Sequence, residues 1–123
     1  MKNKTIFCDI DGTLFKYRDF KTIRHTEPEL TPGSYVKMNK WASDGHCIVI
    51  TTARPESMRE HTINELSNTG IPFDQLIMGI GGDSRHIIND NCPKNPTVPR
   101  AGSFSLLRDE GMKNITISRK EKR

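Results

Sequence analysis

Short apolar runs, separated by polar and turn-forming stretches, dominate the hydrophobic pattern of this chain. Clear runs occupy residues 5–10, 47–52 and 76–79, and a shorter one lies within 85–91. Runs of this length that are rich in β-branched residues are typical of strands buried in a sheet. Residues 31–43 and 56–68 instead carry apolar positions at helical spacing, and each is followed by a glycine that can end a helix.

This alternation of strands and helices predicts the fold class. We expect an α/β domain with three layers, Rossmann-like, built on a central and mostly parallel sheet with right-handed crossovers. The first strand should lie at the centre of that sheet, and residues 101–107 are a candidate for a last edge strand. No insertion is large enough to form a separate cap domain, so we expect an open pocket.

The segment between the first strand and the first helix, residues 16–31, is charged and has no periodic pattern. It is expected to form a loop or flap beside the pocket. The side chains on it that could reach a substrate are Tyr17, Arg18, Lys21, Arg24 and His25. The helix that follows should begin with Thr31 as its N-cap and Pro32 at its first helical position.

Two carboxylates, Asp9 and Asp11, follow the first apolar run directly. Residues two apart on a strand point the same way, so both acids should open into one pocket at the end of this strand. Two acids in one pocket repel, unless a hard cation such as Mg²⁺ neutralises them or one of them holds a proton. Gly12 permits a sharp turn after the second acid, and Thr13 offers a hydroxyl and an amide to a phosphate.

The same stretch resembles the first motif of the haloacid dehalogenase (HAD) superfamily of phosphatases, an apolar strand followed by Asp-x-Asp-x-Thr-Leu. The matching residues are Asp9, Ile10, Asp11, Gly12, Thr13 and Leu14. The resemblance implies that Asp9 is a nucleophile that forms an aspartyl-phosphate and that Asp11 is the general acid and base. It also implies Mg²⁺, held by the Asp9 carboxylate and by the main-chain carbonyl of Asp11.

The family's second motif is an apolar strand closed by Ser or Thr, often before a small residue and Arg. Thr52 fits this position because Ala53 and Arg54 follow it, and Thr51 is the alternative. A hydroxyl at the carboxyl end of a parallel strand lies where ligands bind. We therefore expect Thr52 to donate a hydrogen bond to phosphoryl oxygens.

The third and fourth motifs supply a cation and further metal ligands. Arg85 is the closest match to the cation that balances the phosphate charge, and Lys94 is the alternative. For the metal, the resemblance implies Asp90 at the end of a strand within 85–91. Asn89 is a weaker candidate, and Asp83 ranks behind Asp90 because no acid follows it at the usual spacing.

Composition and charge limit the classes of partner. The formal charge is +4, but residues 119–123 alone carry four basic groups and one acid, so the body of the chain is nearly neutral. This argues against a broad basic surface for nucleic acid, although a 3′-phosphorylated end remains an alternative substrate. Three widely spaced cysteines argue against a disulfide framework and favour a cytoplasmic location. We expect one catalytic domain over residues 1–118, a basic tail over 119–123, no membrane contact and possible homo-oligomers.

The expected function is therefore Mg²⁺-dependent hydrolysis of a phosphomonoester, with a small sugar phosphate or nucleotide as substrate. The run Ile88, Asn89, Asp90, followed by a proline-rich loop and by Arg100 and Ala101, is similar to small HAD proteins of capsule and sugar-nucleotide biosynthesis. Two alternatives stay open. One is a polynucleotide 3′-phosphatase, and the other is a non-catalytic HAD-like module that holds Mg²⁺ or phosphate.

Overall fold

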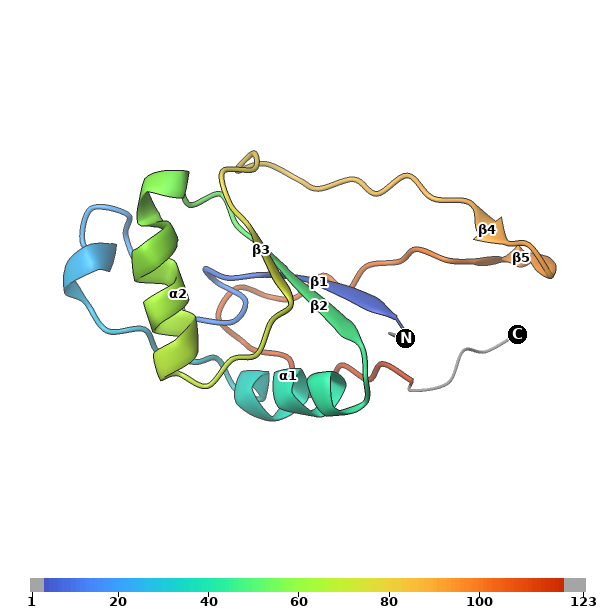
Figure 1. The fold of residues 1–123 in the computed structure, drawn as a ribbon, viewed down its shortest axis with the longest axis horizontal. Helices are drawn as coiled ribbons and strands as arrows, with labels where there is room; N and C mark the ends of the chain where they lie inside the picture. Colours follow the sequence, from blue (N-terminus) through green and yellow to red (C-terminus); the bar gives the residue numbers. More distant parts are fainter. Residues whose placement is uncertain (1–3, 119–123) are drawn as a thin grey trace.

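The main sheet has three parallel strands in the order β1, β2, β3 (Figure 1). They are β1 (Thr5–Asp9), β2 (Cys47–Thr51) and β3 (Gln75–Ile77) in a computed structural model that describes residues 4–118. The three clear apolar runs thus form the predicted strands. The expected central position of the first strand is wrong, because β2 lies in the middle and β1 at an edge.

Two helices form within the segments that the sequence predicts to be helical. Helix α1 spans Ser34–Ser43, and α2 spans Arg59–Asn68 after a short 3-10 helix, η2, at Glu56–Met58. The expected start of α1 is wrong by two residues. Gly33 caps the helix in a left-handed conformation (φ 81°), while the Thr31 hydroxyl donates 2.5 Å to the carbonyl of Thr13. Thr31 therefore ties the helix start to the turn after β1.

The hydrophobic core lies where the helices meet one face of the sheet. Along β1 the side chains alternate, so Ile6 and Cys8 are buried while Phe7 is 56% exposed. All three central residues of β2 are buried, as a continuous apolar run predicts. The core side chains include Ile6, Cys8, Ile48, Ile50 and Leu76 from the sheet and Met38, Trp41 and Leu66 from the helices.

After β3 the chain leaves the sheet and forms an extended arm. Its tip is an antiparallel hairpin of β4 (Asn91–Cys92) and β5 (Asn95–Pro99), which Figure 1 shows at the opposite end of the molecule from α2. The strand expected within 85–91 and the edge strand expected at 101–107 are not formed. Ile88 is 99% exposed, so its segment has neither a strand partner nor apolar cover, which a buried strand requires.

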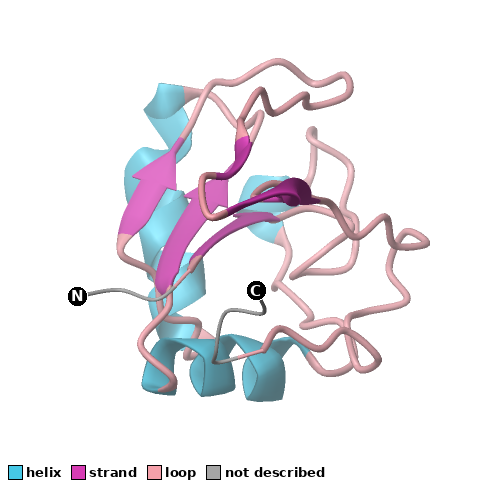
Figure 2. Cartoon of the chain, turned by 90° about the vertical axis from the view of Figure 1, so that its right-hand side faces the viewer, coloured by secondary structure: helices cyan, strands magenta, loops and turns pink. Residues whose placement is uncertain are grey.

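The chain then returns along residues 108–118 to the beginning of the molecule. The amide of Asp109 donates to the carbonyl of Gly12 at 2.9 Å, and the amide of Met112 donates to that of Pro32 at 2.9 Å. Met112 itself is 2% exposed and joins the core. Figure 2 shows most of the loop segments gathered to one side of the sheet's strands. The return places Arg108 beside the turn that carries the acid pair.

Within residues 4–118, no helix is long and apolar enough to cross a bilayer. The tail predicted at 119–123 lies outside the described residues.

Candidate active site

Asp9 and Asp11 line a single cavity of about 280 Å³ at the carboxyl end of β1. β1 ends at Asp9, and Gly12 turns the chain with a φ of 86°, a left-handed value that favours glycine. Both acids are therefore at the position that the sequence pattern predicts. The side chain of Asp9 is 33% exposed and that of Asp11 is 21% exposed, so both can be reached from the cavity.

The turn after the acids is closed by its own backbone hydrogen bonds. The amide of Gly12 donates to Phe15 at 2.8 Å, and that of Thr13 donates to Ile10 at 3.1 Å. The Thr13 amide, which the sequence offered as a phosphate donor, is therefore already used inside the turn, as is the Gly12 amide. The Thr13 hydroxyl lies 3.4 Å from Oδ2 of Asp9 and can orient that carboxylate.

At the end of the neighbouring strand, Thr52 rather than Thr51 lines the cavity. Thr52 is 1% exposed, and its hydroxyl oxygen accepts the amide of Arg54 at 3.1 Å. That contact uses a lone pair and leaves the hydroxyl proton available to a ligand. Thr52 is thus placed to serve as the hydroxyl donor expected at this strand end.

Arg54 holds Asp11 in a two-point contact that the sequence patterns did not predict. Its Nε and Nη2 donate to the two carboxylate oxygens of Asp11 at 2.9 and 2.8 Å. The third nitrogen, Nη1, donates to Glu65 at 2.9 Å and to Thr62 at 3.0 Å. Burial acts to lower the pKa of Arg54, but its hydrogen bonds to Asp11 and Glu65 outweigh this and raise the pKa above its ordinary value.

Glu65 extends this contact to the flap. Its carboxylate also accepts two hydrogen bonds from Arg18, at 2.8 and 2.9 Å. Burial acts to raise the pKa of Glu65, but the hydrogen bonds from Arg18 and Arg54 produce a net decrease. The flap at residues 16–31 is therefore linked to Asp11 through Arg18, Glu65 and Arg54. The only signal for this network in the sequence is an acid on the inward side of α2, which is an unusual position for Glu.

Asp9 has a different environment. Arg85 lies 3.4 Å from Oδ1 of Asp9 and lines the same cavity, as expected for the motif cation. Burial raises the pKa of Asp9 above its ordinary value, while the positive charge of Arg85 opposes this increase. Arg85 therefore favours the ionised form of Asp9.

Arg108 is a cavity residue that the sequence patterns missed altogether. Its guanidinium lies 4.4 Å from the centre of the Tyr17 ring, and both residues line the cavity. Arg108 comes from the returning C-terminal segment, far in sequence from any motif. The hydrogen bond from the Asp109 amide to the Gly12 carbonyl helps to bring it to the acid pair. A pattern of apolar positions could not have revealed this contact.

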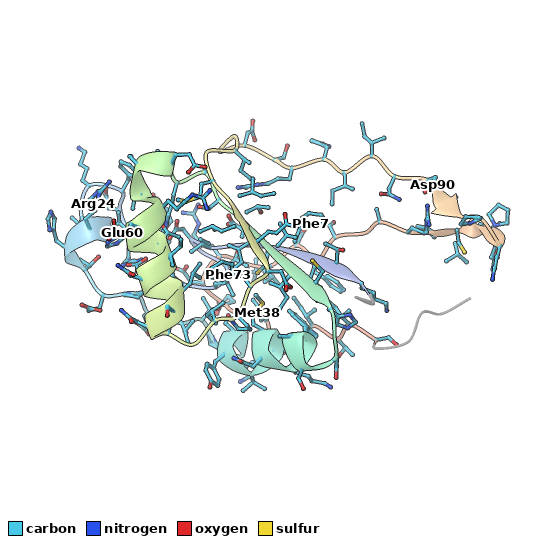
Figure 3. The ribbon with its side chains drawn as sticks, viewed as in Figure 1. Phe7, Arg24, Met38, Glu60, Phe73 and Asp90 are labelled. Carbon is cyan, nitrogen blue, oxygen red and sulfur yellow. The ribbon has the colours of Figure 1, made fainter. Side chains whose placement is uncertain are left out.

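Asp90 and Lys94 do not join the site, so their predicted roles are corrected. Figure 3 shows Asp90 at the β4–β5 end of the molecule, where its carboxylate pairs with Arg100. Asn89 donates to Asp90 at 3.2 Å and belongs to the same arm. Lys94 is exposed in the hairpin and does not line the cavity. Asp90 and Asn89 were assigned from a strand that the chain does not form, and Lys94 was assigned from the loop that follows it.

The described residues fit Mg²⁺ only in part. In residues 4–118 there is no group of three or more acidic, histidine or cysteine side chains able to hold a metal ion. Asp83, which ranked behind Asp90 as a predicted ligand, follows the lining residue Gly82 directly but does not itself line the cavity. However, Mg²⁺ is commonly held by one or two carboxylates together with waters and substrate phosphate oxygens. The acid pair suits this mode of binding rather than a cage made only of protein ligands.

Comparisons with known proteins agree with this architecture. The sequence model of the PITM 1-3 LNS2 domain matches residues 6–92, and no curated protein matches the chain. A chain in a structure of a Pnkp1/Rnl/Hen1 complex is 26% identical with a TM-score of 0.55, and the match covers 69% of this chain and 31% of that one. This chain thus spans under a third of that protein's length.

A second structure, a structural-genomics target from Vibrio cholerae, is 20% identical with a TM-score of 0.50. The match covers 82% of this chain and 90% of that one. It confirms the predicted α/β, HAD-like fold, in which helices flank a parallel sheet and the described residues form no cap.

Proposed function

This chain belongs to the PITM 1-3 LNS2 domain family, a group with a HAD-like fold, and from that premise we propose that it is a phosphomonoester hydrolase with Asp9 as its nucleophile. The observation that carries the proposal is the position of Asp9. It stands at the end of β1, partly exposed in a cavity to which arginines contribute most of the positive charge. The proposed substrates are small sugar phosphates or nucleotides.

The reaction consists of two displacements at phosphorus. A carboxylate oxygen of Asp9 attacks and forms an acyl-phosphate, while the bond to the leaving oxygen breaks and Asp11 gives that oxygen a proton. Asp11 then takes a proton from the water that cleaves the acyl-phosphate, which releases phosphate and restores Asp9. Because Arg54 donates to both oxygens of Asp11, the proton that Asp11 carries must sit on a lone pair that these hydrogen bonds leave free, unless one of them opens.

Two neighbouring groups reduce the cost of the charge that accumulates at phosphorus. Arg85 can move its guanidinium from Asp9 to the phosphoryl oxygens, which it can bind with two parallel hydrogen bonds. The Thr52 hydroxyl supplies a short neutral donor from the adjacent strand end. Mg²⁺, held by Asp9 and by the main chain at Asp11, would add electrostatic stabilisation of the phosphoryl group when bound.

The test is replacement of the nucleophile. Asp9→Asn should reduce Mg²⁺-dependent release of phosphate from p-nitrophenyl phosphate to background, while the circular dichroism spectrum stays that of the folded protein. Asp90→Asn is the matched control, because it makes the same chemical change on an exposed carboxylate outside the cavity. Phosphate release that survives in the folded Asp9→Asn protein would exclude the proposed role of Asp9.

A further inference from the structure

Among residues 4–118, Arg108 differs from the other arginines of the cavity in having no acidic partner. Arg54 is bound to Asp11 and Glu65, Arg18 to Glu65, and Arg85 faces Asp9. Within residues 4–118, no carboxylate lies within ion-pair distance of the Arg108 guanidinium. Its positive charge is therefore not offset by a neighbouring acid, although it lines the same cavity as the nucleophile.

The structure also fixes where this guanidinium lies. The aliphatic part of Arg108 packs on Gly12, where an added Cβ would be 3.2 Å from its Cγ. The next residue, Asp109, donates its amide to Gly12 at 2.9 Å and accepts the amide of Tyr17 at 2.7 Å. Arg108 is thus attached to both the catalytic turn and the flap.

The Tyr17 ring orients the charged group. A guanidinium over an aromatic face gains cation–π attraction while the N–H groups at its edge stay free to donate. The cavity, at about 280 Å³, is near the lower end of ligand pockets, which typically measure about 300–1,000 Å³. Its size suits a small molecule whose phosphate faces Asp9 and whose remaining part reaches Arg108.

We infer that Arg108, supported by Tyr17, forms a second anion-binding subsite, and that the substrate is a small phosphomonoester carrying a second anionic group, a carboxylate or a phosphate. This inference rests on the proposed function, because it takes the phosphate at Asp9 to be the one that is hydrolysed. The planar guanidinium suits either anion, since both offer two oxygens to parallel N–H donors.

The inference is tested with two substrates that differ only in the second anion. In 3-phosphoglycerate a carboxylate replaces the hydroxymethyl group of glycerol 3-phosphate. We expect kcat/KM for 3-phosphoglycerate to exceed that for glycerol 3-phosphate by about tenfold or more, as for one charge-assisted hydrogen-bonded contact. In Arg108→Gln this ratio should fall at least about fivefold, and in Arg108→Lys, which keeps the charge but loses the planar fork, it should fall less.

The matched control is Arg24→Gln. Arg24 is an exposed arginine of the flap at residues 16–31 and does not line the cavity. In Arg24→Gln the ratio of the two kcat/KM values should therefore stay at the wild-type value. If the ratio in Arg108→Gln equals that of the wild-type protein, the inference is overturned. If Arg108→Gln does not fold, Arg108→Ala provides the same readout, and an unchanged ratio there likewise overturns the inference.

Binding separates a failure of this inference from a failure of the proposed function. Calorimetric titration of 3-phosphoglycerate and glycerol 3-phosphate into Asp9→Asn measures affinity without turnover. If the wild-type protein hydrolyses neither substrate, but 3-phosphoglycerate binds more tightly and Arg108→Gln removes the difference, the subsite stands and the hydrolase proposal fails. Turnover of both substrates with no dependence on Arg108 leaves the hydrolase and excludes the subsite.

Discussion

Replacement of Arg54 by Met should destabilise the protein strongly, because this side chain joins two carboxylates inside the fold. The Arg54 side chain is 2% exposed, and its three nitrogens make four hydrogen bonds, to Asp11, Glu65 and Thr62. Met fills a similar volume, so the change removes the charge and the donors while it preserves much of the packing. In the variant, Asp11 loses its contact with Arg54, and Glu65 keeps its contact with Arg18.

The magnitude follows from the burial of the acids that lose their partner. Removing one member of a buried ion pair typically costs about 3–5 kcal/mol. Asp11 is 21% exposed and can recover some hydration, and Glu65 keeps its two hydrogen bonds from Arg18. We therefore expect a loss near the lower limit, about 3 kcal/mol. Arg54→Lys should cost less, since it keeps the charge and loses the two-point contact.

The assay is urea unfolding followed by the fluorescence of Trp41, which is the single tryptophan and is 3% exposed. Lys16→Met is the control, because Lys16 pairs with Glu29 on the exposed surface and such pairs contribute little. A loss below about 1 kcal/mol for Arg54→Met would refute the view that this network stabilises the fold. An Arg54→Lys protein as stable as the wild type would refute the importance of the two-point geometry.

Two further predictions concern the pH profile and the returning segment. Because Asp9 must be ionised to attack and Arg85 lowers its pKa, Arg85→Gln should shift the acid limb of the kcat/KM profile to higher pH, and an unshifted limb would contradict this coupling. Gly111→Ala should lower the free energy of unfolding by at least about 1–2 kcal/mol, the cost of left-handed strain alone. Gly111 has a φ of 86°, and a Cβ added there would lie 2.1 Å from the carbonyl oxygen of Pro32. Gly102→Ala is the control, because a Cβ added at Gly102 would meet no atom within 4 Å. Equal urea midpoints for the two variants would contradict the close packing of Gly111 against Pro32.

The local parts of this fold were predictable from the sequence, and the long-range ones were not. The run from Cys47 to Thr51 gives a strong local strand signal, since a continuous apolar run of β-branched residues is typical of a strand covered on both faces. The pair Ile87 and Ile88 gives a similar local signal, yet both are exposed in the arm. Whether a short apolar run becomes a strand depends on a partner elsewhere in the chain, and that partner cannot be read from the run itself.

The same distinction applies to the site. Asp9, Asp11 and Thr52 follow strands whose parallel pairing brings them to one edge of the sheet, so their position follows from local pattern and topology. Arg108 reaches the cavity through a contact between segments almost a hundred residues apart, and Glu65 reaches it through a network of side chains. These contacts leave no periodic trace in the sequence.

The arrangement of charge explains why the arginines divide into two groups. Arg18 and Arg54 are buried against Glu65 and Asp11, so their charges are already offset and they hold the flap and the acid in place. In the described part of the chain, Arg85 has a long contact to Asp9, and Arg108 stacks on the Tyr17 ring with no acid in ion-pair distance. Only these two can exchange their present contacts for a ligand at little cost, because breaking a buried ion pair is far more expensive than leaving an exposed one. In the proposed mechanism, the fixed cations thus position Asp11, and the exchangeable cations are left to bind the substrate.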